Sequence, residues 1–198
     1  MMKRLLAGIS VALLAIFAVA CGSNGAAKQS SSNGSKIQVV ASLDFYGEVA
    51  KAVGGNKVSV QSIINNPAVD PHDYEPTTKV GKSVASADLV VASGIGYDGW
   101  MDKVVKSADK SKNYLRVADD LMNKKEGDNE HIWYDPRTMP KLANTLADKF
   151  AKKDPADKAT FKANAKKYIA SLDDLNTLIN KLKSKVNGQL VDVSEPVF

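Results

Sequence analysis

The sequence contains only two histidines, His72 and His131, and imidazole is the most versatile metal ligand at neutral pH. His72 lies in residues 65–76, where three prolines stiffen the backbone, since each ring fixes φ and biases the preceding residue towards extended geometry. A stiff loop lowers the cost of ordering a ligand before an ion binds. On this loop alone, a turn that carries a solvated histidine is the simpler interpretation.

The segment His131–Pro136 contains the second histidine. Asp135 in this segment has two possible roles, which are to orient a histidine or, more simply, to cap a helix that we expect to begin at Pro136. Trp133 is expected to pack against its neighbours rather than to form a platform for a ligand.

Glu195 follows a predicted last strand, which is the topological position that the histidines occupy in the first part of the chain. Two imidazoles and one carboxylate suit Zn²⁺, Mn²⁺ or Fe²⁺, and this ligand set does not decide among them. From its residue type alone, Glu195 is an exposed acid near the end of the sequence.

The only cysteine, Cys21, follows a basic segment, residues 1–4, and an apolar run, residues 5–20. This run has the length of a signal-peptide core and is short for a bilayer span. The segment resembles a bacterial lipobox, with Ala18 where leucine is usual, which predicts a signal peptide over residues 1–20 and a lipid on Cys21. The alternative is a plain secretory signal with an incidental cysteine. Residues 21–35 are rich in Ser, Gly, Asn and Ala, as in a flexible tether.

The composition is that of an ordinary globular protein, with 44% hydrophobic and 25% charged residues. The net charge of +5 includes Lys3 and Arg4 of the predicted signal peptide, and the remaining excess is modest and spread over lysine-rich predicted helices. No dense basic patch is interleaved with aromatic residues, so we expect no nucleic-acid partner.

Predicted strands alternate with predicted helices between residues 36 and 153, which indicates an α/β lobe with a mostly parallel sheet flanked by helices. Such sheets bind ligands beyond the carboxyl ends of their strands. His72 follows the second strand and His131 follows the fourth, so we expect both at the same rim of the sheet. The strands are expected at residues 37–41, 57–64, 88–93 and 114–117, and the helices at 44–53, 77–87, 100–107 and 136–152.

An apolar stripe with helical period predicts one long helix over residues 154–187. Such a helix is unusually long for a compact domain and suits a strut between two lobes. Residues 189–193 predict a further strand, so we expect residues 188–198 to begin a second, incomplete lobe.

Three segments together resemble one family, and these are Asp70–Pro76, Ala87–Val90 and His131–Pro136. They look like the zinc/manganese-type (cluster A-I) solute-binding lipoproteins of bacterial ABC importers, over residues 36–198. The resemblance implies two α/β lobes joined by a long helix, with a metal ion in the cleft between them.

In that family, His72 and His131 match the first two metal ligands, and Glu195 matches the third. The fourth, an aspartate of the second lobe, has no counterpart. The resemblance implies a monomer, lipid-anchored outside the membrane of a Gram-positive-like cell. It would capture Zn²⁺ or Mn²⁺ and deliver the ion to a permease, with release through a modest local rearrangement.

Two alternatives remain open from the sequence. A surface adhesin could use the same fold. A secreted metal-dependent hydrolase would need an open coordination position and a general base. The sequence contains no His-Glu-x-x-His pattern, so we expect no enzyme.

Overall fold

The computed structural model describes residues 35–186, 188–190 and 192–193, so Cys21 and Glu195 lie outside the described residues. Four parallel strands form one sheet in the order β2-β1-β3-β4. The α/β prediction is thereby confirmed. The strands are β1 (Ile37–Leu43), β2 (Val58–Ile64), β3 (Leu89–Ala92) and β4 (Tyr114–Arg116).

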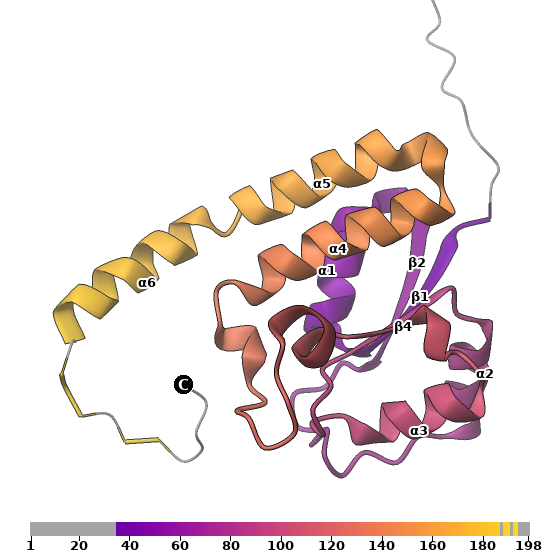
Figure 1. Cartoon of the computed structure of the whole chain (residues 1–198), viewed down its shortest axis with the longest axis horizontal. Coiled ribbons are helices and arrows are strands. Elements are labelled where there is room, and N and C mark those ends of the chain that lie inside the picture. The colour runs from indigo at the N-terminus through magenta and orange to yellow at the C-terminus, as the bar shows by residue number, and fades with distance from the viewer. Residues whose placement is uncertain (1–34, 187, 191, 194–198) are drawn as a thin grey trace, which may run out of the picture. The chain divides into compact units, whose positions relative to one another are not determined.

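Helices cover both faces of the sheet (Figure 1). Right-handed crossovers in this strand order require the β1–β2 connection on one face and the β2–β3 and β3–β4 connections on the other. The first face carries α1 (Asp44–Gly54), α4 (Thr138–Lys153) and α5 (Lys158–Ala170). The second face carries α2 (Thr78–Ser86) and α3 (Gly99–Ser107).

The core is built from both sides of the central strands. All four residues of β3 are buried, as expected for a parallel strand covered on both faces. On the α1 side, Phe150 of α4 meets Phe161 of α5 edge to face, with ring centroids 5.6 Å apart. The largest fully buried side chains are Tyr46, Phe150, Phe161, Met101, Leu142 and Leu146.

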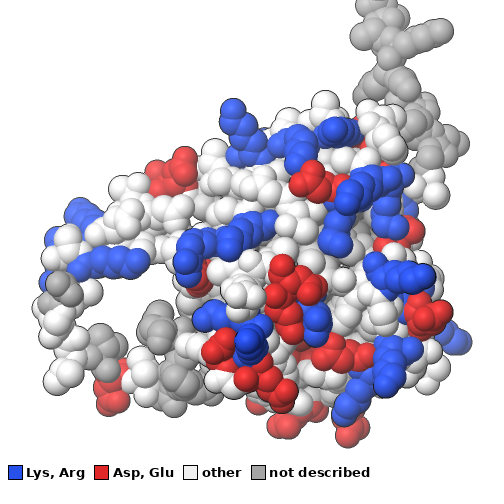
Figure 2. All heavy atoms as spheres, viewed as in Figure 1, with Lys and Arg blue, Asp and Glu red and all other residues white. Residues whose placement is uncertain are grey.

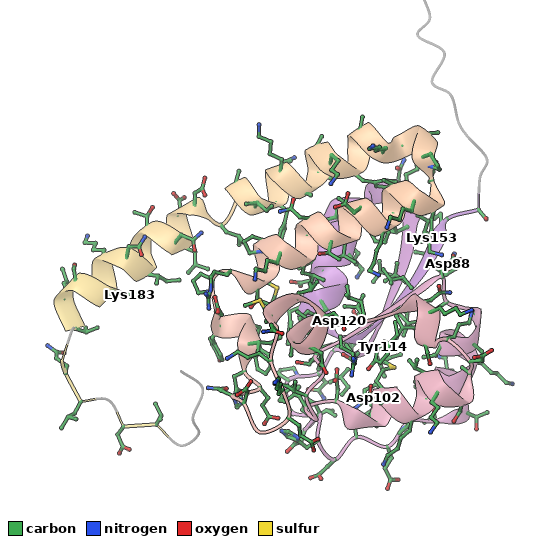
Figure 3. The ribbon with its side chains drawn as sticks, viewed as in Figure 1. Asp88, Asp102, Tyr114, Asp120, Lys153 and Lys183 are labelled. Atoms are coloured by element: carbon green, nitrogen blue, oxygen red, sulfur yellow. The ribbon has the colours of Figure 1, made fainter. Side chains whose placement is uncertain are left out.

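Charged side chains tie the ends of elements together at the surface. Asp88, just before β3, lies 3.7 Å from Lys153 at the end of α4 and accepts a hydrogen bond from the backbone N–H of Gln38 (Figure 3). On the face seen in Figure 2, Lys and Arg are interspersed with Asp and Glu. This mixture agrees with the dispersed charge expected from the sequence.

The segment predicted as one long helix is interrupted. A 3₁₀ turn (η5, Pro155–Asp157) precedes α5, and α6 (Asp173–Val186) follows after Ser171 and Leu172. The Ser171 N–H bonds to the carbonyls of both Lys167 and Tyr168, and its hydroxyl donates to Tyr168 O at 2.6 Å. This tightening ends α5, and the acidic pair Asp173 and Asp174 favours a new helix start.

The prediction of a strand at residues 189–193 is wrong for residues 189–190 and 192–193, which are the described part of this segment. Leu190 is fully exposed. A strand is stabilised by hydrogen bonds to a neighbouring strand, and the sheet of the described chain ends at β2 and β4. None of the helices in the described part of the chain combines the length and apolar character needed to cross a bilayer.

Candidate metal site

The loop that carries His72 follows the carboxyl end of β2 and is held by its own side chains. Asp70 Oδ1 accepts the backbone N–H of His72 at 2.9 Å, and Asn66 Oδ1 accepts that of Ala68 at 3.0 Å. The indole N–H of Trp100, in the first turn of α3, donates to the carbonyl of Pro71 at 3.1 Å. These bonds fix the backbone of His72, whose side chain is 45% exposed.

His131 follows the connection from β4, just before the short 3₁₀ turn η4 (Ile132–Tyr134). Asn129 Oδ1 accepts the backbone N–H of His131 at 2.9 Å and lies 3.1 Å from its ring Nδ1. An amide oxygen can only accept, so Nδ1 is the protonated nitrogen and Nε2 carries the lone pair in the neutral ring. Asn129 therefore sets His131 in the tautomer that presents Nε2 to an ion.

The ring of Tyr97 neighbours both histidines. Its ring centroid is 4.9 Å from that of His72 and 6.1 Å from that of His131. Trp133 belongs to the same group of rings. Its ring centroid is 5.3 Å from that of His131 and 4.9 Å from that of Tyr97. His72 and His131 thus neighbour the same tyrosine at one rim of the sheet, as the order of the strands predicts.

The loop that presents Tyr97 is strained and tightly anchored. Gly94 and Gly96 have φ values of +89° and +94°, and Ile95, which is not a glycine, has +43°. Positive φ is unfavourable for a β-branched residue, so surrounding contacts must impose it. A Cβ added at Gly94 would lie 2.1 Å from Oδ2 of Asp119, the atom that accepts the Ile95 N–H at 3.1 Å.

Asp98 is the main anchor of this loop. Its carboxylate is 1% exposed and accepts the backbone N–H groups of Ser93 at 2.7 Å and of Gly94 at 3.0 Å. Burial raises the pKa of Asp98, although these hydrogen bonds oppose the shift. Nearby, burial also raises the pKa of Tyr46, whose hydroxyl lies 3.1 Å from Ser93 Oγ.

Glu130 joins the two histidine segments. Its Oε1 lies 3.1 Å from Nε2 of His72, and it directly precedes His131 in the chain. Among the residues that the structure describes, no three His, Cys, Asp or Glu side chains gather closely enough to hold an ion. A hollow of about 290 Å³ beside His131 is lined by Met122, Lys124, Asn129, His131, Ile132, Tyr134 and Asp135.

Asp135 fills neither of the two roles predicted for it, because its carboxylate binds Arg137. Helix α4 begins at Thr138, not at Pro136, and its N-terminus has no side-chain cap. Asp135 Oδ1 accepts the backbone N–H of Arg137, and the carboxylate also pairs with the Arg137 guanidinium. This guanidinium lowers the pKa of Asp135. The predicted cap is therefore wrong in detail, because the helix starts two residues later.

The sequence alone does not identify three residues of this site, which are Tyr97, Asn129 and Glu130. The signal for Tyr97 is the glycine-punctuated segment that follows the third strand, because loops at this edge of a parallel sheet line its ligand site. Asn129 and Glu130 lie in a polar loop of ordinary composition, which carries no comparable signal.

The sequence model of the family described as zinc-uptake complex component A, periplasmic (ZnuA), matches residues 39–198. The chain is 30% identical to the manganese ABC transporter substrate-binding lipoprotein PsaA of Streptococcus pneumoniae, over all of this chain and 67% of PsaA. It is 32% identical to the metal ABC transporter substrate-binding lipoprotein SsaB of Streptococcus sanguinis, over 91% of this chain and 60% of SsaB.

Solved structures show the same similarity. The metal-dependent lipoprotein YcdH of Bacillus subtilis gives a TM-score of 0.67 at 28% identity, covering 76% of this chain and 57% of YcdH. Zn(II)-bound AdcA of Streptococcus pneumoniae gives 0.61 at 26% identity, covering 72% of this chain and 32% of AdcA. The chain thus spans about two thirds or less of the length of these relatives.

Proposed function

Because the chain belongs to the zinc-uptake complex component A (ZnuA) family, we propose that it captures a divalent transition-metal ion outside the cell membrane and delivers it to the permease of an ABC importer. The observation that carries this proposal is the meeting of His72 and His131 around Tyr97. Two imidazoles from separate loops converge on one rim of a rigid sheet, where parallel α/β sheets bind ligands.

In this proposal the ion is the transported substrate, Mn²⁺ or Zn²⁺, and its ligands are His72, His131 and Glu195. Imidazole and carboxylate ligands suit both ions. The relatives divide in the same way, since PsaA is named for manganese and the AdcA structure contains zinc. A carboxylate as third ligand favours Mn²⁺ slightly.

The surrounding residues would prepare the site before the ion arrives. Trp100 holds the backbone next to His72, and Asn129 selects the tautomer of His131. Tyr97 supplies a wall against which both rings rest. Such preorganisation lowers the ordering cost of binding.

We also propose that a lipid on Cys21 anchors the protein at the outer surface of the cell membrane. We further propose that the protein acts as a monomer. Relatives named as lipoproteins support the anchor. Their names describe substrate-binding proteins of transporters, so we assign no catalytic activity to this chain.

Metal titration of the full chain by calorimetry tests the function. We expect binding of Mn²⁺ or Zn²⁺, and we expect His72→Ala and His131→Ala each to weaken it at least about tenfold, since each removes one ligand. Both side chains lie outside the core, so the free energy of unfolding should change by less than about 1 kcal/mol. Lys79→Ala, an exposed change in α2, is the control.

Thermal unfolding provides an independent readout. An ion at about 100 times its dissociation constant stabilises the folded state by about 2.7 kcal/mol and so raises the melting temperature. If neither ion shifts the melting temperature of the full chain, the transport proposal is refuted. If a histidine variant unfolds but its folded fraction binds the ion normally, that histidine is structural.

A further inference from the structure

We propose that Glu130 belongs to the cation site: its carboxylate pairs with His72 when no ion is bound and coordinates the ion once it arrives. This inference rests on the proposed function. It adds a carboxylate from the first lobe to the ligands that the family resemblance implies.

The distance between Glu130 and His72 falls in the range found for two ligands of one ion. Metal–nitrogen and metal–oxygen bonds are about 2.1 Å long, so two ligands at a tetrahedral or octahedral angle lie about 3.0–3.4 Å apart. The distance from His72 Nε2 to Glu130 Oε1 is 3.1 Å. An ion bound to both atoms would lie beside the line that joins them, so the two side chains would turn towards it without moving apart.

The position of Glu130 in the chain directs it towards the second histidine as well. It is adjacent to His131, whose Nδ1 is held by Asn129 so that Nε2 is presented to an ion. The nitrogen of His72 that Glu130 contacts therefore faces the segment carrying His131. The three side chains do not gather around one point in the described structure, so sharing one ion requires a side-chain rearrangement, for which the carboxylate is placed beside one histidine and next to the other in the chain.

The exposure of the pair permits this exchange. The side chains of His72 and Glu130 are 45% and 28% exposed, so neither is locked in the core. Their contact contributes little to stability because it is accessible to water. An incoming divalent ion therefore competes with His72 for the carboxylate.

The chemistry of the carboxylate bears on which ion is preferred. Oxygen ligands suit Mn²⁺ relatively better than Zn²⁺, which binds nitrogen and sulfur ligands well. Glu130 should therefore raise the affinity for Mn²⁺ more than the affinity for Zn²⁺.

The test compares Glu130→Gln with Glu126→Gln in the full chain, each titrated with Mn²⁺ and with Zn²⁺. Both changes remove one negative charge from the same loop, but Glu126 is exposed and four residues earlier in the chain. We expect Glu130→Gln to weaken Mn²⁺ binding at least tenfold and Zn²⁺ binding less, and Glu126→Gln to change either by less than twofold. Glu130→Asp keeps the charge on a shorter side chain, and we expect an intermediate loss.

Two further measurements make the outcome decisive. X-ray absorption of the Zn²⁺-loaded protein should show one oxygen ligand fewer in Glu130→Gln, and circular dichroism should show an unchanged fold. The inference is overturned if the Glu130→Gln and Glu126→Gln proteins bind both ions equally well. If the wild-type protein still binds an ion, that result rejects the role of Glu130 and leaves the proposed function intact. If the wild-type protein binds neither ion, the proposed function itself is refuted.

Discussion

Replacing Asp98 with alanine should destabilise the protein more than any other single change at the rim of the sheet. The Asp98 carboxylate is 1% exposed and accepts two buried backbone N–H groups, those of Ser93 and Gly94. Alanine leaves both donors without this acceptor, and an unsatisfied buried donor costs about 1–3 kcal/mol. We therefore expect the free energy of unfolding to fall by about 2–6 kcal/mol at neutral pH.

The pH dependence of stability provides a second signature of Asp98. Because burial raises its pKa above the ordinary value of 3.8, the folded state binds the proton more tightly than the unfolded state does. The proton-linked part of its contribution is therefore complete below pH 3.8 and is lost as the pH rises through the folded-state pKa, whereas its hydrogen bonds to the Ser93 and Gly94 N–H groups persist at neutral pH. The wild-type protein should show this slope, and Asp98→Ala should lack it.

Urea denaturation followed by circular dichroism over a series of pH values measures both effects. Asp174→Ala is the control, since Asp174 is exposed in the first turn of α6 and should cost less than about 1 kcal/mol. The loop also presents Tyr97, so metal affinity should fall in Asp98→Ala but not in the control. If Asp98→Ala were as stable as the control at neutral pH, the assigned anchoring role would be refuted.

Two further predictions concern the segments that carry the histidines. Trp100→Phe removes the donor to Pro71 O, so the free energy of unfolding should fall by about 0.5–1.5 kcal/mol and metal affinity should fall with it, as urea denaturation and calorimetry would measure. Unchanged affinity would mean that the indole N–H does not position His72. The Arg137 guanidinium lowers the pKa of Asp135, so this pair stabilises the fold above pH 3.8 and its contribution is lost as the pH falls through the folded-state pKa. Because the Arg137 guanidinium is exposed, the contribution of the pair is small, and Arg137→Gln should remove this acid-side slope in denaturation measured over pH. An identical slope in the variant would contradict the assignment.

The sequence predicts most of the first lobe because its signals are local. Runs of β-branched residues alternate with helical periodicity, and this alternation is sufficient to predict a parallel sheet with helices on both faces. Placing His72 and His131 at one rim required only their positions after the second and fourth strands. The predicted bounds of all four strands agree with the structure to within two residues.

The errors occur where the outcome depends on contacts along or beyond the segment. The apolar stripe continues through Ser171, so periodicity alone predicts an unbroken helix, whereas the local hydrogen bonds of Ser171 end α5. Residues 189–193 have the composition of a strand, but in the described part of the chain they have no neighbouring strand to pair with. Composition measures a tendency, and a strand requires a partner.

Only the tertiary structure decided how the site is assembled. Tyr97 neighbours both histidines because buried Asp98 and partly buried Asp119 bend the loop after β3. Glu130 reaches His72 from a loop far along the chain. Sequence periodicity reports which face of an element is buried, and topology reports at which end of a strand a loop lies. Neither gives the distance between two side chains on different loops, because that distance is set by the packing of the whole sheet and its helices.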